Sequence, residues 1–177
     1  MLAINFNRIR NSDQALTEIS EPVELRPEFF ERSKKILTDA KNVKVTGSLF
    51  YDDPFVIGSF KVTADLVVPS TRSLKPVEFH QEFKFTENYY QTSYDPEMVG
   101  DDEVLVKIDG DLIDLQTAVE DNIILNIPER ILAPDEEDEF PEGKGWKVIS
   151  EADFDKQEKA SKESPFAALK DLFDDQE

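Results

Sequence analysis

Residues 43–90 read VKVTGSLFYDDPFVIGSFKVTADLVVPSTRSLKPVEFHQEFKFTENYY, and the alternation of apolar with polar side chains in this stretch decides the fold. The pattern is clearest near its end, where the apolar phase holds Val77, Phe79, Phe83 and Phe85 and the polar phase holds Glu78, His80, Glu82 and Lys84. A period of two residues is typical of a strand with one face in a core. It occurs three times between residues 42 and 86, separated by turn residues at 52–54 and 69–73, and it therefore predicts three antiparallel strands.

The same alternation outside this stretch predicts further strands. One is expected around Leu2, Ile4 and Phe6, a second between residues 16 and 25, and a third at residues 104–108. About six strands are more than a flat, one-sided sheet needs. We therefore expect an antiparallel curved sheet or a partly closed β-barrel, which would hide its edge strands.

Two helices are expected to pack on this sheet. The first covers residues 27–40, because Pro27 suits a first helical turn and an apolar stripe follows it. The second covers residues 114–127, with Asp114 as its N-cap, apolar residues every four positions, and Pro128 preventing further extension. The expected fold class is α+β, with residues 1–133 forming one domain.

The composition changes after residue 133. Residues 134–177 hold fifteen acids and six bases, and they begin with five consecutive acids from Asp135 to Glu139. This segment is expected to be an acidic, partly disordered tail. Two places in it could dock on a surface: the segment around Trp146, and a short terminal helix near residues 165–173. The apolar face of that helix would carry Phe166, Leu169, Leu172 and Phe173.

Composition also excludes several classes of function. The chain has 177 residues, no cysteine, one histidine, and 39 acids against 20 bases, for a net charge of −19. The absence of cysteine removes thiol nucleophiles and thiolate metal sites, and it agrees with a cytoplasmic location. No apolar stretch is long enough to span a membrane, and no phosphate-binding, zinc-hydrolase or EF-hand motif occurs. No cofactor, resident metal, membrane or small-molecule substrate is therefore expected.

The densest group of carboxylates is Asp109, Asp111 and Asp114. Three acids within six residues could bind a hard cation or act as an acid–base pair, as in a metal-dependent enzyme. An Asp-Gly turn and a helix cap explain the same residues without chemistry, and we favour that interpretation.

The least acidic stretch is the segment from Arg72 to Lys84, which also contains Lys75. These three cations could touch phosphate, so direct RNA binding by this hairpin is an alternative function. Three cations would supply only a modest electrostatic contribution at physiological salt, and RNA contact would then need help from a protein partner. The same residues remain candidates for partner binding, together with Trp146 and the apolar face of the terminal helix.

Three stretches, in their order along the chain, carry a family resemblance. They are STRSLKPVEFHQEFKFTENYY at 70–90, DGDLIDL at 109–115 continuing to LNIP at 125–128, and SPFAALKDLF at 164–173. Together they resemble the YceD-like family of bacterial proteins for large ribosomal RNA subunit accumulation. The family hairpin carries a Cys-x-x-Cys tip, and here Ser70 and Ser73 occupy the thiol positions, so this chain is a cysteine-free variant. The terminal stretch also lacks an arginine of the family pattern.

The resemblance implies a non-enzymatic role in the synthesis or accumulation of large-subunit ribosomal RNA. The partners expected from it are a ribosomal protein, an RNA-processing protein or a pre-ribosomal particle. The charge distribution agrees with this, because an acidic exterior is suited to basic protein partners. A solubility device without any partner explains the same charge equally well. The resemblance therefore implies a ribosome-biogenesis factor that acts by binding, with the metal-dependent enzyme and the direct RNA binder as alternatives.

Overall fold

The computed structural model describes residues 1–91, 100, 103–136, 140, 142–149 and 153–154. It divides the chain into two compact units, Met1–Ala133 and Pro134–Glu177. The elements of the first unit are β1 (Ile4–Asn5), α1 (Phe6–Arg10), β2 (Thr17–Pro22), α2 (Pro27–Ser33), β3 (Asp39–Asp52), β4 (Phe55–Pro69), β5 (Pro76–Tyr90), β6 (Leu105–Lys107), β7 (Leu112–Ile113) and α3 (Leu115–Leu125). The second unit contains β8 (Glu142–Gly143) and β9 (Trp146–Lys147).

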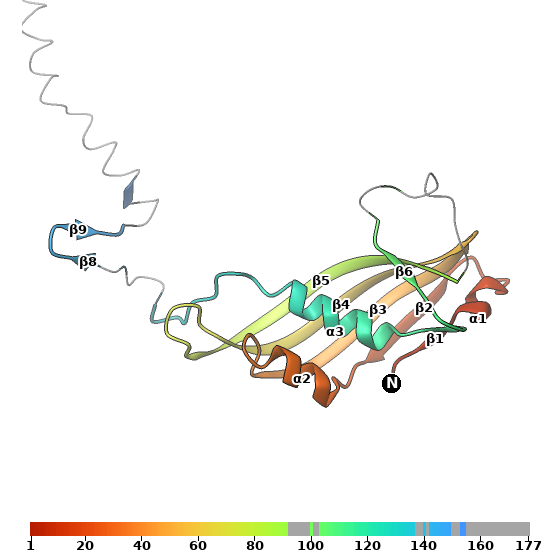
Figure 1. Ribbon diagram of the computed structural model, residues 1–177, viewed down its shortest axis with the longest axis horizontal. Helices are drawn as coiled ribbons and strands as arrows, with labels where there is room; N and C mark the ends of the chain where they lie inside the picture. Colours follow the sequence, from red (N-terminus) through yellow and green to blue (C-terminus); the bar gives the residue numbers. More distant parts are fainter. Residues whose placement is uncertain (92–99, 101–102, 137–139, 141, 150–152, 155–177) are drawn as a thin grey trace, which may run out of the picture. The chain divides into compact units, whose positions relative to one another are not determined.

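Five strands form the main sheet of the first unit, in the order β2-β3-β4-β5-β6 (Figure 1). The three long strands predicted between residues 42 and 86 are confirmed as β3, β4 and β5, which form an antiparallel meander. A strand predicted between residues 16 and 25 is also confirmed, as β2. The α+β class is therefore correct.

The described strands do not form the expected partly closed barrel. The sheet is open and mixed, because β6 runs parallel to β5 and pairs with it only at residues 88–90. Closure of a barrel requires the last strand to pair with the first along a matching length. A three-residue strand cannot provide that pairing, and β6 and β2 remain at opposite edges of the sheet.

The N-terminal segment differs from its expected strand. Only Ile4 and Asn5 are extended, and they pair with β7, more than a hundred positions away in the sequence. The side chain of Asn5 then accepts a hydrogen bond from the main-chain amide of Arg8, which starts α1. Phe6 and Ile9 lie three positions apart, so one helical turn buries both of them. The apolar spacing at residues 2–6 therefore did not reveal this helix.

The two predicted helices are present with different lengths. α2 ends at Ser33 and not near residue 40, because the main-chain amide of Thr38 donates to the carbonyl of Val67 and starts the pairing of β3 with β4. Leu37, at 1% exposure, reaches the core from the turn between them. α3 has the predicted cap, since an Asp114 carboxylate oxygen accepts from the amide of Thr117 at 3.0 Å.

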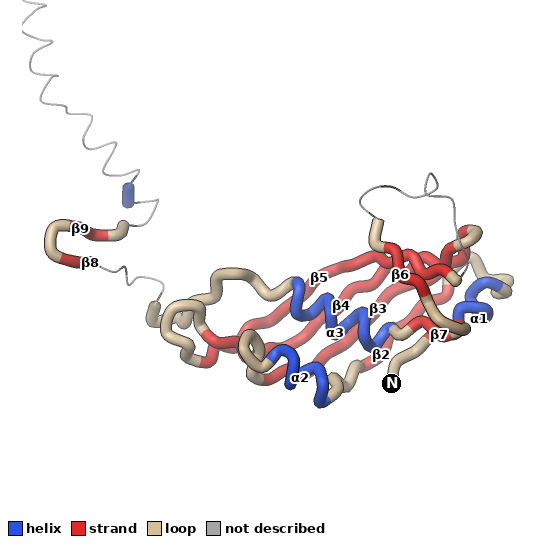
Figure 2. Tube along the Cα trace, viewed as in Figure 1, coloured by secondary structure: helices blue, strands red, loops and turns tan. Residues whose placement is uncertain are grey.

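One face of the sheet is covered by α2 and α3 (Figure 2). The buried core between them is aliphatic and aromatic, and includes Val45, Leu49, Val62, Leu66, Phe29, Leu115, Val119 and Ile123. The opposite face is polar: Ser59 and Thr86 approach within 3.3 Å, and Lys61 forms an ion pair with Glu82 at 2.8 Å. Among the described residues, no helix has both the length and the apolar character required to cross a membrane.

Candidate functional site

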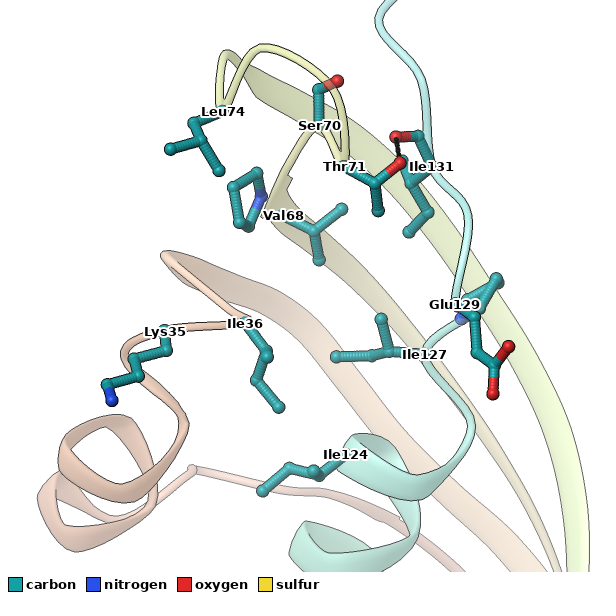
Figure 3. Close-up of a pocket in the computed structure, with 12 residues that line it drawn as sticks. Lys35, Ile36, Val68, Ser70, Thr71, Leu74, Ile124, Ile127, Glu129 and Ile131 are labelled. Carbon is teal, nitrogen blue, oxygen red and sulfur yellow. Dashed lines mark hydrogen bonds between the residues drawn. The ribbon is translucent and has the colours of Figure 1, made fainter.

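An apolar groove opens where three parts of the first unit meet (Figure 3). One wall is the turn after α2, the second is the end of β4 with the loop that follows it, and the third is the end of α3 with the segment after it. We call this cavity of about 300 Å³ the tip groove. Its lining is Lys35, Ile36, Val68, Pro69, Ser70, Thr71, Leu74, Ile124, Ile127, Pro128, Glu129 and Ile131.

The loop between β4 and β5 is held in shape by Ser70. This side chain is fully buried, and its hydroxyl oxygen accepts hydrogen bonds from the main-chain amides of Arg72 at 3.1 Å and Ser73 at 3.4 Å. Thr71 fixes the loop to the segment after α3, because its amide and its hydroxyl both donate to the carbonyl of Ile131. The serine at the first thiol position of the family pattern therefore acts as a turn acceptor.

Leu74 is the most unusual residue of the tip groove. Its φ angle is +63°, in the left-handed region that a branched side chain rarely adopts, and 75% of its surface is exposed. Across the groove, Ile36 is 42% exposed. A leucine in a costly backbone conformation that contributes little burial to its own fold is a signal of function.

The three cations predicted to bind a partner do not form one site. Arg72 and Lys75 belong to the loop that lines the tip groove, whereas Lys84 lies in the middle of β5, opposite Lys61 on the polar face of the sheet. At the rise of a strand, nine residues separate Lys84 from Lys75 by about 30 Å. The hairpin therefore presents two separate groups of cations.

The other predicted contact residues belong to the second unit. Trp146 lies in β9, is 57% exposed, and its ring lies where a side chain at position 143 would be, so only glycine fits there. Phe166, Leu169, Leu172 and Phe173 lie outside the described residues, as does most of the predicted acidic tail.

The three aspartates of the predicted metal site have different surroundings. The Asp111 carboxylate accepts from Asn7 at 2.8 Å and from Gln91 at 2.9 Å, and Asp114 caps α3. Only Asp109 and Asp114 line a common cavity, of about 290 Å³. Within the described ranges, no group of three or more acids or histidines is arranged to hold a metal ion.

That second cavity contains an acid that sequence reasoning missed. Glu87 is 8% exposed and accepts hydrogen bonds from the Tyr89 hydroxyl at 2.8 Å and the Asn122 amide at 3.2 Å. Burial raises the pKa of Glu87, and the two hydrogen bonds offset only part of that effect. The signal was present in the sequence, because position 87 continues the apolar phase of β5.

His80, the one histidine, lies on the polar face of β5 and its Nδ1 is 2.6 Å from a carboxylate oxygen of Asp65. Hydrogen bonds from Asn42 and His80 lower the pKa of Asp65. The histidine is 65% exposed at its side chain, in agreement with its position in the polar phase.

A protein family and a known protein each match most of this chain. Residues 58–173 match the family model described as large ribosomal RNA subunit accumulation protein YceD. The chain is also 30% identical over 114 residues to a protein of Bacillus subtilis (strain 168) described as uncharacterized protein YlbN. That match covers 63% of this chain and 64% of the relative, so the chain spans less than two thirds of the relative's length.

No solved structure matches the chain. The family match includes β5, α3 and every residue of the loop that shapes the tip groove. Because the match covers well over half of the sequence, the chain belongs to the YceD family of large ribosomal RNA subunit accumulation proteins.

Proposed function

We propose that this protein supports the synthesis or accumulation of large-subunit ribosomal RNA without catalysing a reaction, by binding a protein or ribonucleoprotein partner at the tip groove. The partner is a ribosomal protein, an RNA-processing protein or a pre-ribosomal particle. Membership of the family supports the connection to ribosomal RNA. The observation that carries the choice of site is Leu74, an exposed leucine held in a left-handed conformation.

The chemistry of the groove favours a protein contact over a direct contact with RNA bases. Its lining is mainly aliphatic, and the described residues that form it include no aromatic side chain on which a base could stack. An apolar side chain from a partner would bury Leu74 and Ile36 and displace water from them. Arg72 and Lys75, in the same loop, give this contact a cationic border.

The test uses the full chain, tagged and purified from cells that produce it naturally. Leu74→Gly removes the exposed side chain and relieves the strain of the left-handed backbone conformation. The free energy of unfolding should therefore stay unchanged or rise by about 1 kcal/mol. Leu125→Ala is the matched control, because Leu125 is 78% exposed and lies outside the groove. We expect Leu74→Gly, but not the control, to lose co-purifying large-subunit proteins and to lower the ratio of large- to small-subunit ribosomal RNA.

Two other outcomes would contradict this proposal. A Leu74→Gly variant that retains both readouts would exclude the tip groove as the contact site. An Asp109→Asn variant that lowers the ratio of large- to small-subunit ribosomal RNA, but still captures the partners, would instead favour a catalytic role for the carboxylates. Asp109 is exposed, so its replacement does not disturb the core.

A further inference from the structure

The outer edge of β5 is open along most of its length. β4 pairs with one side of β5 without any register shift from residue 76 to residue 89. On the other side, β6 pairs only with residues 88–90, so within the described part of the chain no strand covers residues 76–87. A free edge of this length is a template for another strand.

The direction of the backbone groups on this edge follows from its paired end. The amide of Asn88 donates to Val104, and the carbonyl of Tyr90 accepts from Ile108, so both residues point toward β6. Backbone groups alternate along a strand. The even-numbered residues from Glu78 to Thr86 therefore present their N–H and C=O groups to the open edge.

The side chains on the core face of this edge are also incompletely covered. Val77, Phe79 and Phe85 are only partly buried. Gln81 is 3% exposed, and its amide nitrogen donates to the carbonyl of Ile123 at 3.2 Å. Its amide oxygen is buried and has no hydrogen-bond partner among the residues that the structure describes. An unsatisfied buried acceptor is costly, and this one lies near the midpoint of the free edge.

The edge is complementary to itself. When two copies of β5 are placed antiparallel about a twofold axis at Gln81, Glu78 of one copy lies opposite Lys84 of the other, and His80 lies opposite Glu82. On the core face, Phe79 then lies opposite Phe83, and Val77 lies opposite Phe85. We propose that this chain forms a symmetric dimer through antiparallel pairing of the two β5 edges about Gln81.

Neighbouring registers are less favourable. An axis one residue earlier places Glu78 opposite Glu82, and an axis one residue later places Glu82 opposite its own copy. Like charges directly opposite each other destabilise a sheet. An axis at Phe83 pairs Glu82 with Lys84, but it extends the ladder onto Asn88, which β6 already occupies. The register at Gln81 uses the whole free edge.

This register also supplies the missing partner of Gln81. Since even-numbered residues carry the new backbone hydrogen bonds, the two Gln81 residues form a non-hydrogen-bonded pair, with Cβ atoms about 4.5–5.5 Å apart. Each amide nitrogen has a second hydrogen, which can donate to the orphan oxygen of the other copy. An unrelated extended peptide would not supply both this amide and the matching charges, so a second copy is the occupant the edge favours.

A charge exchange in the full-length protein tests the proposal by sedimentation velocity at low salt. Glu78→Lys and Lys84→Glu each place like charges opposite one another at two symmetric positions, and each is expected to weaken dimerisation by about tenfold or more. The double variant restores opposite charges and is expected to recover dimerisation to within about threefold of the original chain. Both positions are exposed, and circular dichroism confirms that each variant is folded.

Cysteine crosslinking tests the position of the axis. The chain has no cysteine, so Gln81→Cys introduces one thiol per copy. The expected Cα separation of about 4.5 Å lies within the range of a disulfide, and oxidation should give a covalent dimer. In the control, Thr86→Cys, the two thiols are ten residues out of register, about 33 Å apart, and should not crosslink.

Three results would overturn the dimer. They are a monomer at every accessible concentration, a double charge variant no better than the single variants, or equal crosslinking of the two cysteine variants. A monomer that gains a strand from another protein at this edge would appear as the first of these results. None of them bears on the tip groove, because Leu74 lies outside the paired edge.

Discussion

Arg26 and Glu120 are separated by 94 positions in the sequence and form an ion pair in which a guanidinium Nη2 lies 2.6 Å from a carboxylate oxygen. The guanidinium Nε also donates to both oxygens of Glu120, and the main-chain amide of Arg26 donates to one of them. Burial alone would raise the pKa of Glu120, but the hydrogen bonds from Arg26 and Gln116 outweigh it and lower the pKa. This pair connects the segment before α2 to the middle of α3.

Replacing Arg26 with methionine should destabilise the first unit. Glu120 is 1% exposed at its side chain, and it would keep a buried charge with fewer donors. Because Arg26 is itself 36% exposed, we expect a loss of about 2 kcal/mol, below the usual cost of breaking a fully buried pair. Urea denaturation measures this loss in the free energy of unfolding. Lys61→Met, which breaks the exposed pair with Glu82, should cost less than about 1 kcal/mol. Equal losses in the two variants would contradict this assignment.

Glu87→Gln should raise the melting temperature at neutral pH. The pKa of Glu87 is raised by burial, so the folded protein binds its proton more tightly than the unfolded chain does. That contribution to stability is fully present below the unfolded pKa of about 4.3 and is lost as the pH rises through the folded value. Glutamine cannot ionise, so the Glu87→Gln variant does not lose this stability as the pH rises.

The pH dependence separates this effect from simple repacking. The advantage of Glu87→Gln should be present at pH 7 and should disappear near pH 4, as measured by circular dichroism melts. Asp39→Asn is the control with the opposite sign, because the hydrogen bond from Lys41 lowers the pKa of Asp39. A constant difference between Glu87→Gln and the original chain at both pH values would argue against the ionisation of Glu87.

Gly47→Ala should be destabilising although it lies in a regular strand. A Cβ at Gly47 would clash with the main-chain oxygen of Ser59, and a backbone atom cannot rotate away. We expect a loss of about 1–3 kcal/mol from overpacking. Ser48 is the next residue along β3 and lies on the polar face, so Ser48→Ala should change the free energy of unfolding by no more than about 0.5 kcal/mol. A Gly47→Ala variant as stable as the original would mean that the β3–β4 pairing can shift to admit the methyl group.

Ser70→Ala should loosen the loop between β4 and β5. It leaves the amides of Arg72 and Ser73 without their acceptor, at a cost of about 1–2 kcal/mol. Hydrogen exchange should show faster exchange at these two amides, while amides in the centre of β4 remain protected. Ser73→Ala is the comparison, because the Ser73 hydroxyl accepts from the amide of Lys75 at 3.3 Å, outside the turn that Ser70 caps. Faster exchange throughout the sheet would indicate a global effect and not a loop cap.

Local patterns predicted the parts of the fold that depend on local physics. Period-two alternation predicted β3, β4 and β5, and the acid at Asp114 predicted the start of α3. The missed features depend on distant partners: β6 pairs parallel with β5, and β1 pairs with β7. The sequence also signalled an unusual environment at Gln81 and Glu87, since polar residues there continue an apolar phase.

The candidate site was predictable only in part. Arg72 and Lys75 were expected to bind a partner, and they lie in the loop that shapes the tip groove. The groove itself was not predictable, because it needs the ends of α2, β4 and α3 to meet, and no local pattern encodes their approach. The left-handed backbone at Leu74 could not be anticipated either, since leucine rarely adopts it.

The pairing of Ile4 with Ile113 sets the order in which this chain can finish folding on the ribosome. The amide of Gln116 donates to the carbonyl of Leu2, so residues 1–5 have no docking place until α3 emerges. The long meander can form earlier, because its contacts are local in sequence. Refolding kinetics should therefore resolve the docking of residues 1–5 as a step that is later than formation of the meander.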